Sequence, residues 1–289
     1  MSITETRLTR RALLRSAATL AAASALAGGG TVAYGYWAQR FGVRVDRVNV
    51  TLRTLPPQLS GLTVAHLSDF HHSAAVPLPY IEEVVGITND LQPDLLVLTG
   101  DYIMHDSPEY ALPCATVLGK LHAPLGRFAV LGNHDIWAKP RPIVEALSSN
   151  GITVLRNDGL QLQPGLWLLG VDDVWEHRDD LSGTFERLNP PAEAAKILLA
   201  HEPDFADIAR DFPIDLQLSG HSHGGQVRLP LLGAPRLPWL GERYPIGLAA
   251  LDRLQVYTTR GIGVLDSMPF RFNCPPEITF LTLHAEGQS

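Results

Sequence analysis

The chain has 289 residues, of which 45% are hydrophobic and 18% are charged, and its formal net charge is -7. This hydrophobic share can build a core and excludes an intrinsically disordered chain. The acidic balance argues against a nucleic-acid partner, because nucleic-acid-binding surfaces are basic. Two cysteines exclude a disulfide scaffold and a cysteine-rich zinc module. Eleven histidines and a basic start remain to be explained.

The first forty residues are typical of an export leader. Residues 1–15 hold four arginines against one glutamate, and residues 16–38 carry no charge. A basic start, an apolar middle and small residues near its end predict a secretion signal. Residues 9–15, TRRALLR, resemble the twin-arginine motif, and residues 25–27, ALA, fit the pattern before a cleavage site. A retained anchor is the alternative, since the uncharged run is long enough to span a bilayer.

Both interpretations place the rest of the chain outside the cytoplasm. We expect it in the periplasm, in the cell wall or on the outer face of the cytoplasmic membrane, with the twin-arginine export machinery as a partner. Residues 1–40 are therefore predicted to be the signal or anchor. No linker rich in Pro, Gly or Ser divides the remainder, so residues 41–289 are predicted to form one domain.

Strands and helices alternate through this domain. The first strand, at residues 43–52, alternates apolar and polar residues and is predicted to be antiparallel or at an edge. Helices are predicted at residues 78–91, 108–121 and 140–150, with a short one after residue 204. The other predicted strands are 62–67, 94–98, 127–131, 152–155, 160–162, 166–171, 196–200, 214–218, 225–229, 254–258 and 278–283. This order predicts an α/β fold with a two-sheet core covered by helices.

Five of the buried strands end directly before a polar motif. The motifs are SDFHH at 68–72, TGD at 99–101, GNHD at 132–135, HEP at 201–203 and SGHSHGG at 219–225. Sites in α/β sheets form at the carboxyl ends of strands, so these motifs are predicted to converge. In an extended chain, Asp69 and His71 point the same way, as do His221 and His223. Carboxylate and imidazole ligands suit Mn, Fe, Zn or Co.

In order and content, these motifs closely resemble the five blocks of the calcineurin-like metallophosphoesterases. The blocks read Asp-x-His, Gly-Asp-x, Gly-Asn-His-Asp/Glu, an isolated His and Gly-His-x-His. Residues 220–226, 259–263 and 276–278 are also similar to the exported bacterial branch of YaeI-type and YkuE-type phosphoesterases. The resemblance covers about residues 45–285. It implies a four-layer architecture, a β-sandwich of two sheets flanked by helices.

The resemblance also implies two divalent metal ions per chain and a metal-dependent phosphoester hydrolase, with a bridging hydroxide as the nucleophile. The implied ligands are Asp69, His71 and His223 for one ion, Asn133, His201 and His221 for the other, and Asp101 between them. His134 is the implied proton donor or phosphate stabiliser, and Asp135 is expected to orient its ring. We add His72 and Arg260 as candidate substrate-binding residues.

The substrate and several other features stay open at this stage. A phosphodiester linked to a lipid or cell-wall polymer is the expected substrate. A pyrophosphatase of lipid-linked sugar nucleotides and a non-catalytic, metal-stabilised envelope protein are the alternatives. Residues 229–240 are apolar and rich in proline, and they either cover the core or form a lip that contacts lipid or a membrane surface. Cys114 and Cys274 are either paired or free.

Overall fold

The computed structural model describes residues 29–30, 35, 39–105 and 108–287. The twin-arginine motif, the cleavage pattern and most of the uncharged run lie outside these ranges. No helix within them is both long and apolar enough to cross a membrane.

The first sheet has six strands in the order β1-β12-β2-β3-β4-β5. They are β1 (Arg44–Leu52), β12 (Glu277–Ala285), β2 (Thr63–Leu67), β3 (Leu95–Thr99), β4 (Arg127–Val130) and β5 (Thr153–Val154). Strands β2 to β5 are parallel, and β12 runs antiparallel to β2 and parallel to β1. The carboxyl ends of β2, β3 and β4 therefore share one edge of the sheet.

The second sheet also has six strands, in the order β10-β11-β9-β8-β7-β6. They are β10 (Gly247–Leu251), β11 (Leu254–Thr258), β9 (Leu216–Ser219), β8 (Ala195–Leu199), β7 (Leu166–Gly170) and β6 (Asp158–Gln163). The four central strands are parallel, and β10 and β6 are antiparallel to their neighbours at the two edges.

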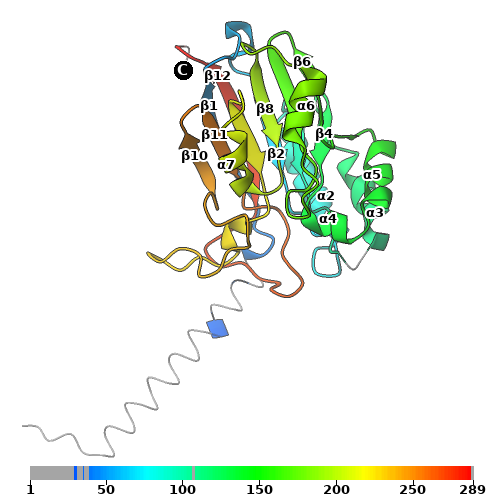
Figure 1. The fold of residues 1–289 in the computed structure, drawn as a ribbon. Coiled ribbons are helices and arrows are strands. Elements are labelled where there is room, and N and C mark those ends of the chain that lie inside the picture. The colour runs from blue at the N-terminus through cyan, green and yellow to red at the C-terminus, as the bar shows by residue number, and fades with distance from the viewer. Residues whose placement is uncertain (1–28, 31–34, 36–38, 106–107, 288–289) are drawn as a thin grey trace, which may run out of the picture.

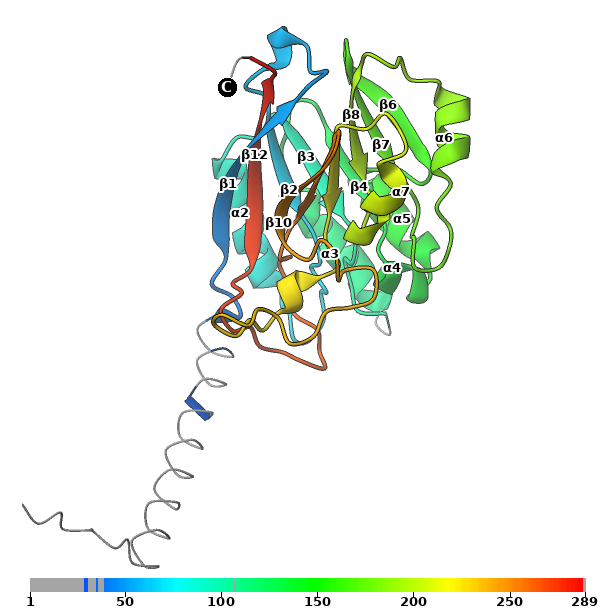
Figure 2. The same ribbon diagram turned by 60° about the vertical axis from the view of Figure 1, so that its left-hand side comes forward.

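Helices cover the outer face of each sheet (Figures 1 and 2). The first sheet packs against α2 (Leu78–Asp90), α3 (Ala111–Leu118), α4 (Asn133–Trp137) and α5 (Pro140–Ser149). The second packs against α6 (Leu181–Leu188) and α7 (Ala206–Ala209). Short 3-10 turns lie at Pro57–Leu59, Pro108–Tyr110, Pro203–Phe205 and His223–Gly225.

Alternating side chains of the strands join these layers. In β3, Leu96 and Leu98 face the helices, whereas Leu95 and Val97 face the second sheet. All four are fully buried, so β3 reads as a continuous apolar run, as strands covered on both faces do. The structure thus confirms the predicted α/β fold, a two-sheet sandwich flanked by helices in four layers.

Several predicted elements need correction. The first strand is an edge strand, but it is parallel to β12 rather than antiparallel. Residues 225–229 are not a strand, because Gly225 and Gln226 both have positive φ and turn the chain. The structure also adds β10, α4 and α6, whose five to eight residues gave no clear periodic pattern.

One buried histidine outside the five motifs makes stability depend on pH. His66, on β2, has its Nε2 2.8 Å from the hydroxyl of Thr99, and its Nδ1 has no partner among the described residues. Burial lowers the pKa of His66 to about 3. Its unfolded pKa is near 6.5, so its contribution to stability is complete above pH 6.5 and is lost as the pH falls toward 3.

We therefore expect His66→Gln to flatten the acid side of the stability profile. Between pH 6.5 and 4.5 the wild type should lose about 2 kcal/mol more free energy of unfolding than the variant, since each unit between the two pKa values contributes about 1.4 kcal/mol. Urea unfolding with a chelator present measures this difference without a contribution from metal release. Parallel profiles for the two proteins would contradict the assignment.

Candidate metal centre

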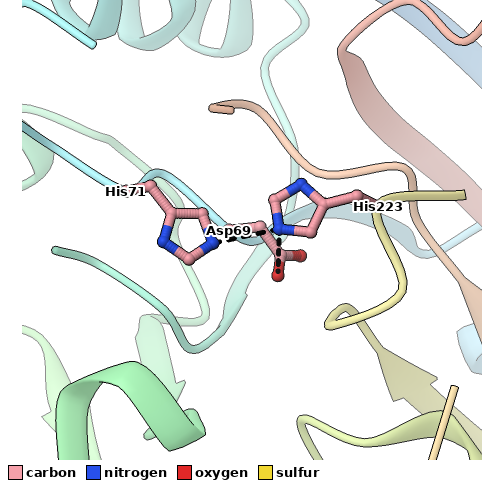
Figure 3. A group of neighbouring side chains, drawn as sticks. All are labelled: Asp69, His71 and His223. Carbon is pink, nitrogen blue, oxygen red and sulfur yellow. Dashed lines mark hydrogen bonds and ion pairs between the residues drawn. The ribbon is translucent and has the colours of Figure 1, made fainter. Parts of the chain in front are cut away.

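Three predicted ligands lie together where β2 and β9 end. Figure 3 shows His71 and His223 approaching each other beside the carboxylate of Asp69. The Nε2 atoms of the two histidines are 3.0 Å apart, and His223 Nε2 lies 3.5 Å from Asp69 Oδ1. All three side chains are buried. They form the first ligand group.

A second ligand group lies at the ends of β3, β4, β8 and β9. Asp101, His201 and His221 offer ligand atoms that all lie within 4.8 Å of one another. His201 Nε2 is 3.2 Å from Asp101 Oδ2. The side-chain oxygen of Asn133 lies 3.1 Å from His221 Nδ1, so the amide joins this group.

Asp101 connects the two groups. Its Oδ2 lies 3.2 Å from His201 Nε2 in the second group and 3.5 Å from His71 Nε2 in the first. Its Oδ1 accepts a hydrogen bond from the backbone N–H of His134 at 2.9 Å. One carboxylate oxygen therefore faces ligands of both groups.

These residues fit metal ions. Nitrogen and oxygen ligands at about 2.0–2.2 Å from one ion stand roughly 3 to 3.5 Å apart, which matches the separations in both groups. His201 Nε2 is buried and faces the carboxylate of Asp101, itself a predicted ligand, as expected of an atom that binds metal. Seven ligand side chains, each at least nine-tenths buried, converge from loops that follow different strands.

The charges of the site depend on its burial. Burial lowers the pKa of His71 and His221 to about 3, so both rings are neutral and can bind metal. Burial alone would raise the pKa of Asp101, but His201 and His134 together hold it well below its usual range. Burial opposes protonation of His201, yet the charge of Asp101 raises its pKa well above normal. A metal ion binding between these two groups must therefore displace a proton.

Second partners fix the two rings of the second group. His201 Nδ1 points to the backbone oxygen of Thr99, and His221 Nε2 lies 2.9 Å from the backbone oxygen of Trp239. When each of these nitrogens donates its proton to the carbonyl, the other ring nitrogen is left free to bind metal. Backbone carbonyls thus select the tautomers that the site requires.

The sequence pattern predicted that the ligands lie on extended chain, but most of them do not. Five of them have positive φ, namely Asp69 (54°), His71 (45°), Asp101 (55°), His221 (66°) and His223 (50°). This left-handed conformation is uncommon for residues other than glycine and concentrates at functional sites. The predicted convergence is correct, but sharp turns at the ligands produce it.

Glycines beside the ligands leave room for the side chains. A Cβ on Gly220 would lie 2.0 Å from Ser68 Oγ and 2.3 Å from Asp69 Oδ2. A Cβ on Gly132 would lie 2.3 Å from Asp101 Oδ1. Because Gly132 has an ordinary φ of -108°, it is close approach and not backbone freedom that requires glycine there.

His134 stands beside the first ligand group. Its ring centroid is 4.7 Å from that of His71, and the ring is only partly buried. A ligand atom of His134 lies within 4.8 Å of those of His71 and Asp101. This position is compatible with the predicted contact to a phosphate held by the metals.

Asp135 binds the main chain of the loops that carry the ligands. Its carboxylate accepts hydrogen bonds from the backbone N–H groups of Asp101 (2.8 Å), Tyr102 (2.9 Å) and Gly132 (3.0 Å). Burial raises the pKa of Asp135 to about 8 in the absence of metal. Both oxygens are thus engaged with main chain, and Asp135 joins the ligand loops after β3 and β4.

The two candidate substrate-binding residues each have partners of their own in the protein. His72 directs its Nδ1 to the backbone oxygen of Val76 at 2.8 Å and packs against Tyr110. Arg260 forms ion pairs with Asp46 (2.6 Å) and Glu277 (2.9 Å). Cys114 and Cys274 are buried free thiols, so the disulfide alternative is wrong.

An aromatic wall beside the site, formed by Trp137, Trp175 and Trp239, was not predicted from the sequence. The ring of Trp175 lies 5.6 Å from Trp137, 5.1 Å from Trp239 and 5.7 Å from the ligand His221. Trp137 also lies 5.1 Å from His134. The sequence does contain a signal for this wall, because Trp137 and Trp175 each follow a strand end by a few residues.

Arg271 was also missed, and its place in the sequence gives no hint of its role. The side chain is fully buried and donates to the backbone oxygens of Arg260, Gly261 and Gly263. That segment packs on the first ligand group, since Gly263 N–H donates to the backbone oxygen of Asp69 at 2.7 Å. Arg271 therefore supports the loop behind a ligand.

Buried carboxylates, imidazoles and an amide at converging strand ends define a metal-binding cluster of the kind that hydrolases use. Residues 62–225 match the family described as calcineurin-like phosphoesterase. The chain belongs to this family and is a metal-dependent phosphoester hydrolase, as the sequence predicted.

Three relatives illustrate the similarity. The metallophosphoesterase YkuE of Bacillus subtilis is 33% identical, over 96% of this chain and 98% of that protein. The phosphodiesterase YaeI of Escherichia coli is 38% identical, over 76% and 81%. The UDP-2,3-diacylglucosamine pyrophosphatase LpxG of Chlamydia trachomatis is 28% identical, over 83% and 88%. The predicted similarity to YkuE and YaeI is confirmed.

Proposed function

We propose that this protein hydrolyses phosphodiesters with two divalent metal ions, drawn from Mn, Fe, Zn and Co. The observation that carries the proposal is the position of Asp101, whose Oδ2 faces His71 in one ligand group and His201 in the other. Asp101 and the two ligand groups would hold two ions, which would supply an activated water and neutralise charge on the phosphoryl oxygens. The similarity to YaeI supports a diester as the substrate.

Purified protein with bis-p-nitrophenyl phosphate tests the proposal. We expect turnover with at least one of Mn, Zn, Fe or Co, and none after a chelator has removed the metal. If none of the four metals supports turnover of a diester or a pyrophosphate, the non-catalytic alternative is favoured. The similarity to LpxG supports the second candidate, a pyrophosphatase of lipid-linked sugar nucleotides. Faster turnover of such a pyrophosphate than of any diester would establish it.

In the proposed reaction, His134 donates a proton to the leaving oxygen or stabilises the phosphate. It is the partly buried histidine beside the first ligand group, so it can reach both substrate and solvent. General acid catalysis matters most when the leaving group is a strong base.

We expect His134→Ala to slow the hydrolysis of an alkyl diester by about 10²-fold or more. The hydrolysis of a nitrophenyl diester should slow much less. Steady-state rates on the two substrates measure the contrast. His284→Ala is the matched control, because His284 lies on β12 and bonds Asn49. If the hydrolysis of both substrates slowed equally, His134 would not be the proton donor.

The proposed substrates are linked to lipids or cell-wall polymers outside the cytoplasm. The aromatic wall supports this class, because it places three large apolar rings beside the metal ligands. Trp137 and Trp239 are 40% and 50% exposed, so they can contact a bound molecule.

Export by the twin-arginine route is the proposed path to that location. We expect Arg10→Lys combined with Arg11→Lys to leave the protein in the cytoplasm, since the paired arginines are the signal that this route reads. Cell fractionation and immunoblotting measure the distribution. Arg7→Lys with Arg15→Lys is the control that keeps both the pair and the charge. Normal export of the first double variant would exclude this route.

A further inference from the structure

A tight hairpin at residues 229–233 exposes two leucines. Leu231 and Leu232 are 105% and 80% exposed. Leu229 and Gly233 each donate a backbone N–H to the other's oxygen, at 2.8 and 2.9 Å. Leu231 has a φ of 67°, an outlier conformation for a bulky residue. The turn thus holds two large apolar side chains in water at a conformational cost, which points to a binding role.

The hairpin lies where the uncharged N-terminal run joins the body. At its base, the N–H of Arg228 donates to the oxygen of Phe272 at 2.9 Å. The next residue, Asn273, donates its N–H to the side chain of Gln39 at 2.7 Å. The hairpin, in yellow, projects beside the blue start of the described body in both views (Figures 1 and 2). The two segments are therefore neighbours.

The chemistry of both segments suits a lipid–water interface. Residues 16–38 are uncharged, and Tyr34, Tyr36 and Trp37 remain in the chain even if it is cleaved after residue 27. Tyr and Trp concentrate at membrane interfaces. On the hairpin, the Arg228 guanidinium lies within 4 Å of where a Cβ on Gly233 would be, and Arg236 follows closely. Cations beside apolar side chains favour anionic headgroups.

The same loop reaches the metal centre. Trp239 follows the hairpin, and its backbone oxygen lies 2.9 Å from Nε2 of the ligand His221. Trp239 also belongs to the aromatic wall beside the site. The loop that begins with the hairpin therefore extends as far as the predicted metal ligands.

We propose that residues 229–233 insert into a lipid bilayer with anionic headgroups, and that this insertion turns the metal centre toward the membrane surface. The proposal deepens the proposed function, on which it rests for its location outside the cytoplasm. A bilayer is the occupant because a protruding turn needs no complementary pocket to enter a fluid layer. A protein partner has to provide such a pocket.

A fluorescent probe on the hairpin tests the proposal in the full-length protein. Because both native cysteines are buried, Leu231→Cys is labelled selectively with an environment-sensitive maleimide. Leu112→Cys is the matched control, as Leu112 is 60% exposed on α3, away from the hairpin. The vesicles contain equal parts of phosphatidylglycerol and phosphatidylcholine, with nitroxide-labelled lipid as a quencher.

We expect the hairpin probe to shift to the blue and to be quenched at least twofold, and the Leu112 probe to change little. The proposal is overturned if protein that floats with the vesicles, held by its N-terminal segment, shows no difference between the two probes. A blue shift that needs no vesicles and grows with protein concentration also overturns it, since it assigns the hairpin to self-association.

Removing the leucines gives an independent readout. Leu231→Ser with Leu232→Ser should reduce flotation with anionic vesicles at least threefold, whereas Leu112→Ser with Ile208→Ser should not. Equal flotation of the two double variants contradicts the proposal. Turnover of bis-p-nitrophenyl phosphate by the same preparations without vesicles reports on the proposed function separately, so failure of either one is recognised on its own.

Discussion

Replacing Asp101 with asparagine should lower turnover by about 10³-fold or more and reduce the number of bound metal ions. The substitution keeps the shape of the side chain and removes the negative charge that faces both ligand groups. Without that charge, two ions bound here would repel each other at close range. The phosphoryl oxygens would then no longer be held between two ions. Steady-state rates and metal analysis by mass spectrometry measure the two effects.

Asp252→Asn is the matched control for this variant. Asp252 lies at the turn between β10 and β11 and pairs with Arg210 on the surface, where an ion pair contributes little. Its rate and metal content should equal those of the wild type. Circular dichroism establishes whether both variants fold. Turnover by folded Asp101→Asn within a few-fold of the wild-type rate would refute the bridging role.

The second large effect is expected for Gly132→Ala. The new methyl group would stand 2.3 Å from Asp101 Oδ1 and 2.8 Å from His201 Cε1. The backbone there is extended and accepts alanine, so the whole cost comes from crowding at two ligands. We expect turnover to fall by at least about 10²-fold, since small displacements of catalytic groups are costly. The free energy of unfolding should fall by about 1–3 kcal/mol.

Gly86→Ala is the matched control, because the same substitution should here leave the rate unchanged and raise the stability. Gly86 lies within α2, and a Cβ there meets nothing within 4 Å. This variant should keep its rate and gain roughly 0.5–1 kcal/mol of stability, because alanine loses less backbone entropy than glycine on entering a helix. Urea unfolding and rate measurements test both variants together. An unchanged rate in Gly132→Ala would show that the ligand loops can move apart freely.

Buried strands were the part of the fold that the sequence determined best. Residues 94–98 form a continuous apolar run, and the structure places β3 there, buried on both faces. Short elements without periodic apolar residues escaped prediction, as α6 shows. The order of the strands was also out of reach, because the long-range pairing of β12 with β1 and β2 leaves no local pattern.

For the site, residue types were predictable but local geometry was not. The motifs identified a set of ligands that the structure brings together, including Asn133. The positive φ angles of His71 and His223 follow from the close packing of loops, which spacing does not reveal. The main-chain contacts of Asp135 show the same limit, because the fold alone brings together the backbone N–H groups that donate to its carboxylate.

The last strand of the chain has a consequence for the timing of biosynthesis. Because β12 sits between β1 and β2, the first sheet stays open until residues 277–285 have left the ribosome. Until then, β2, which leads into Asp69 and His71, presents an unpaired edge that invites aggregation. The first sheet can therefore close only after residues 277–285 have been made, however early its other strands emerge.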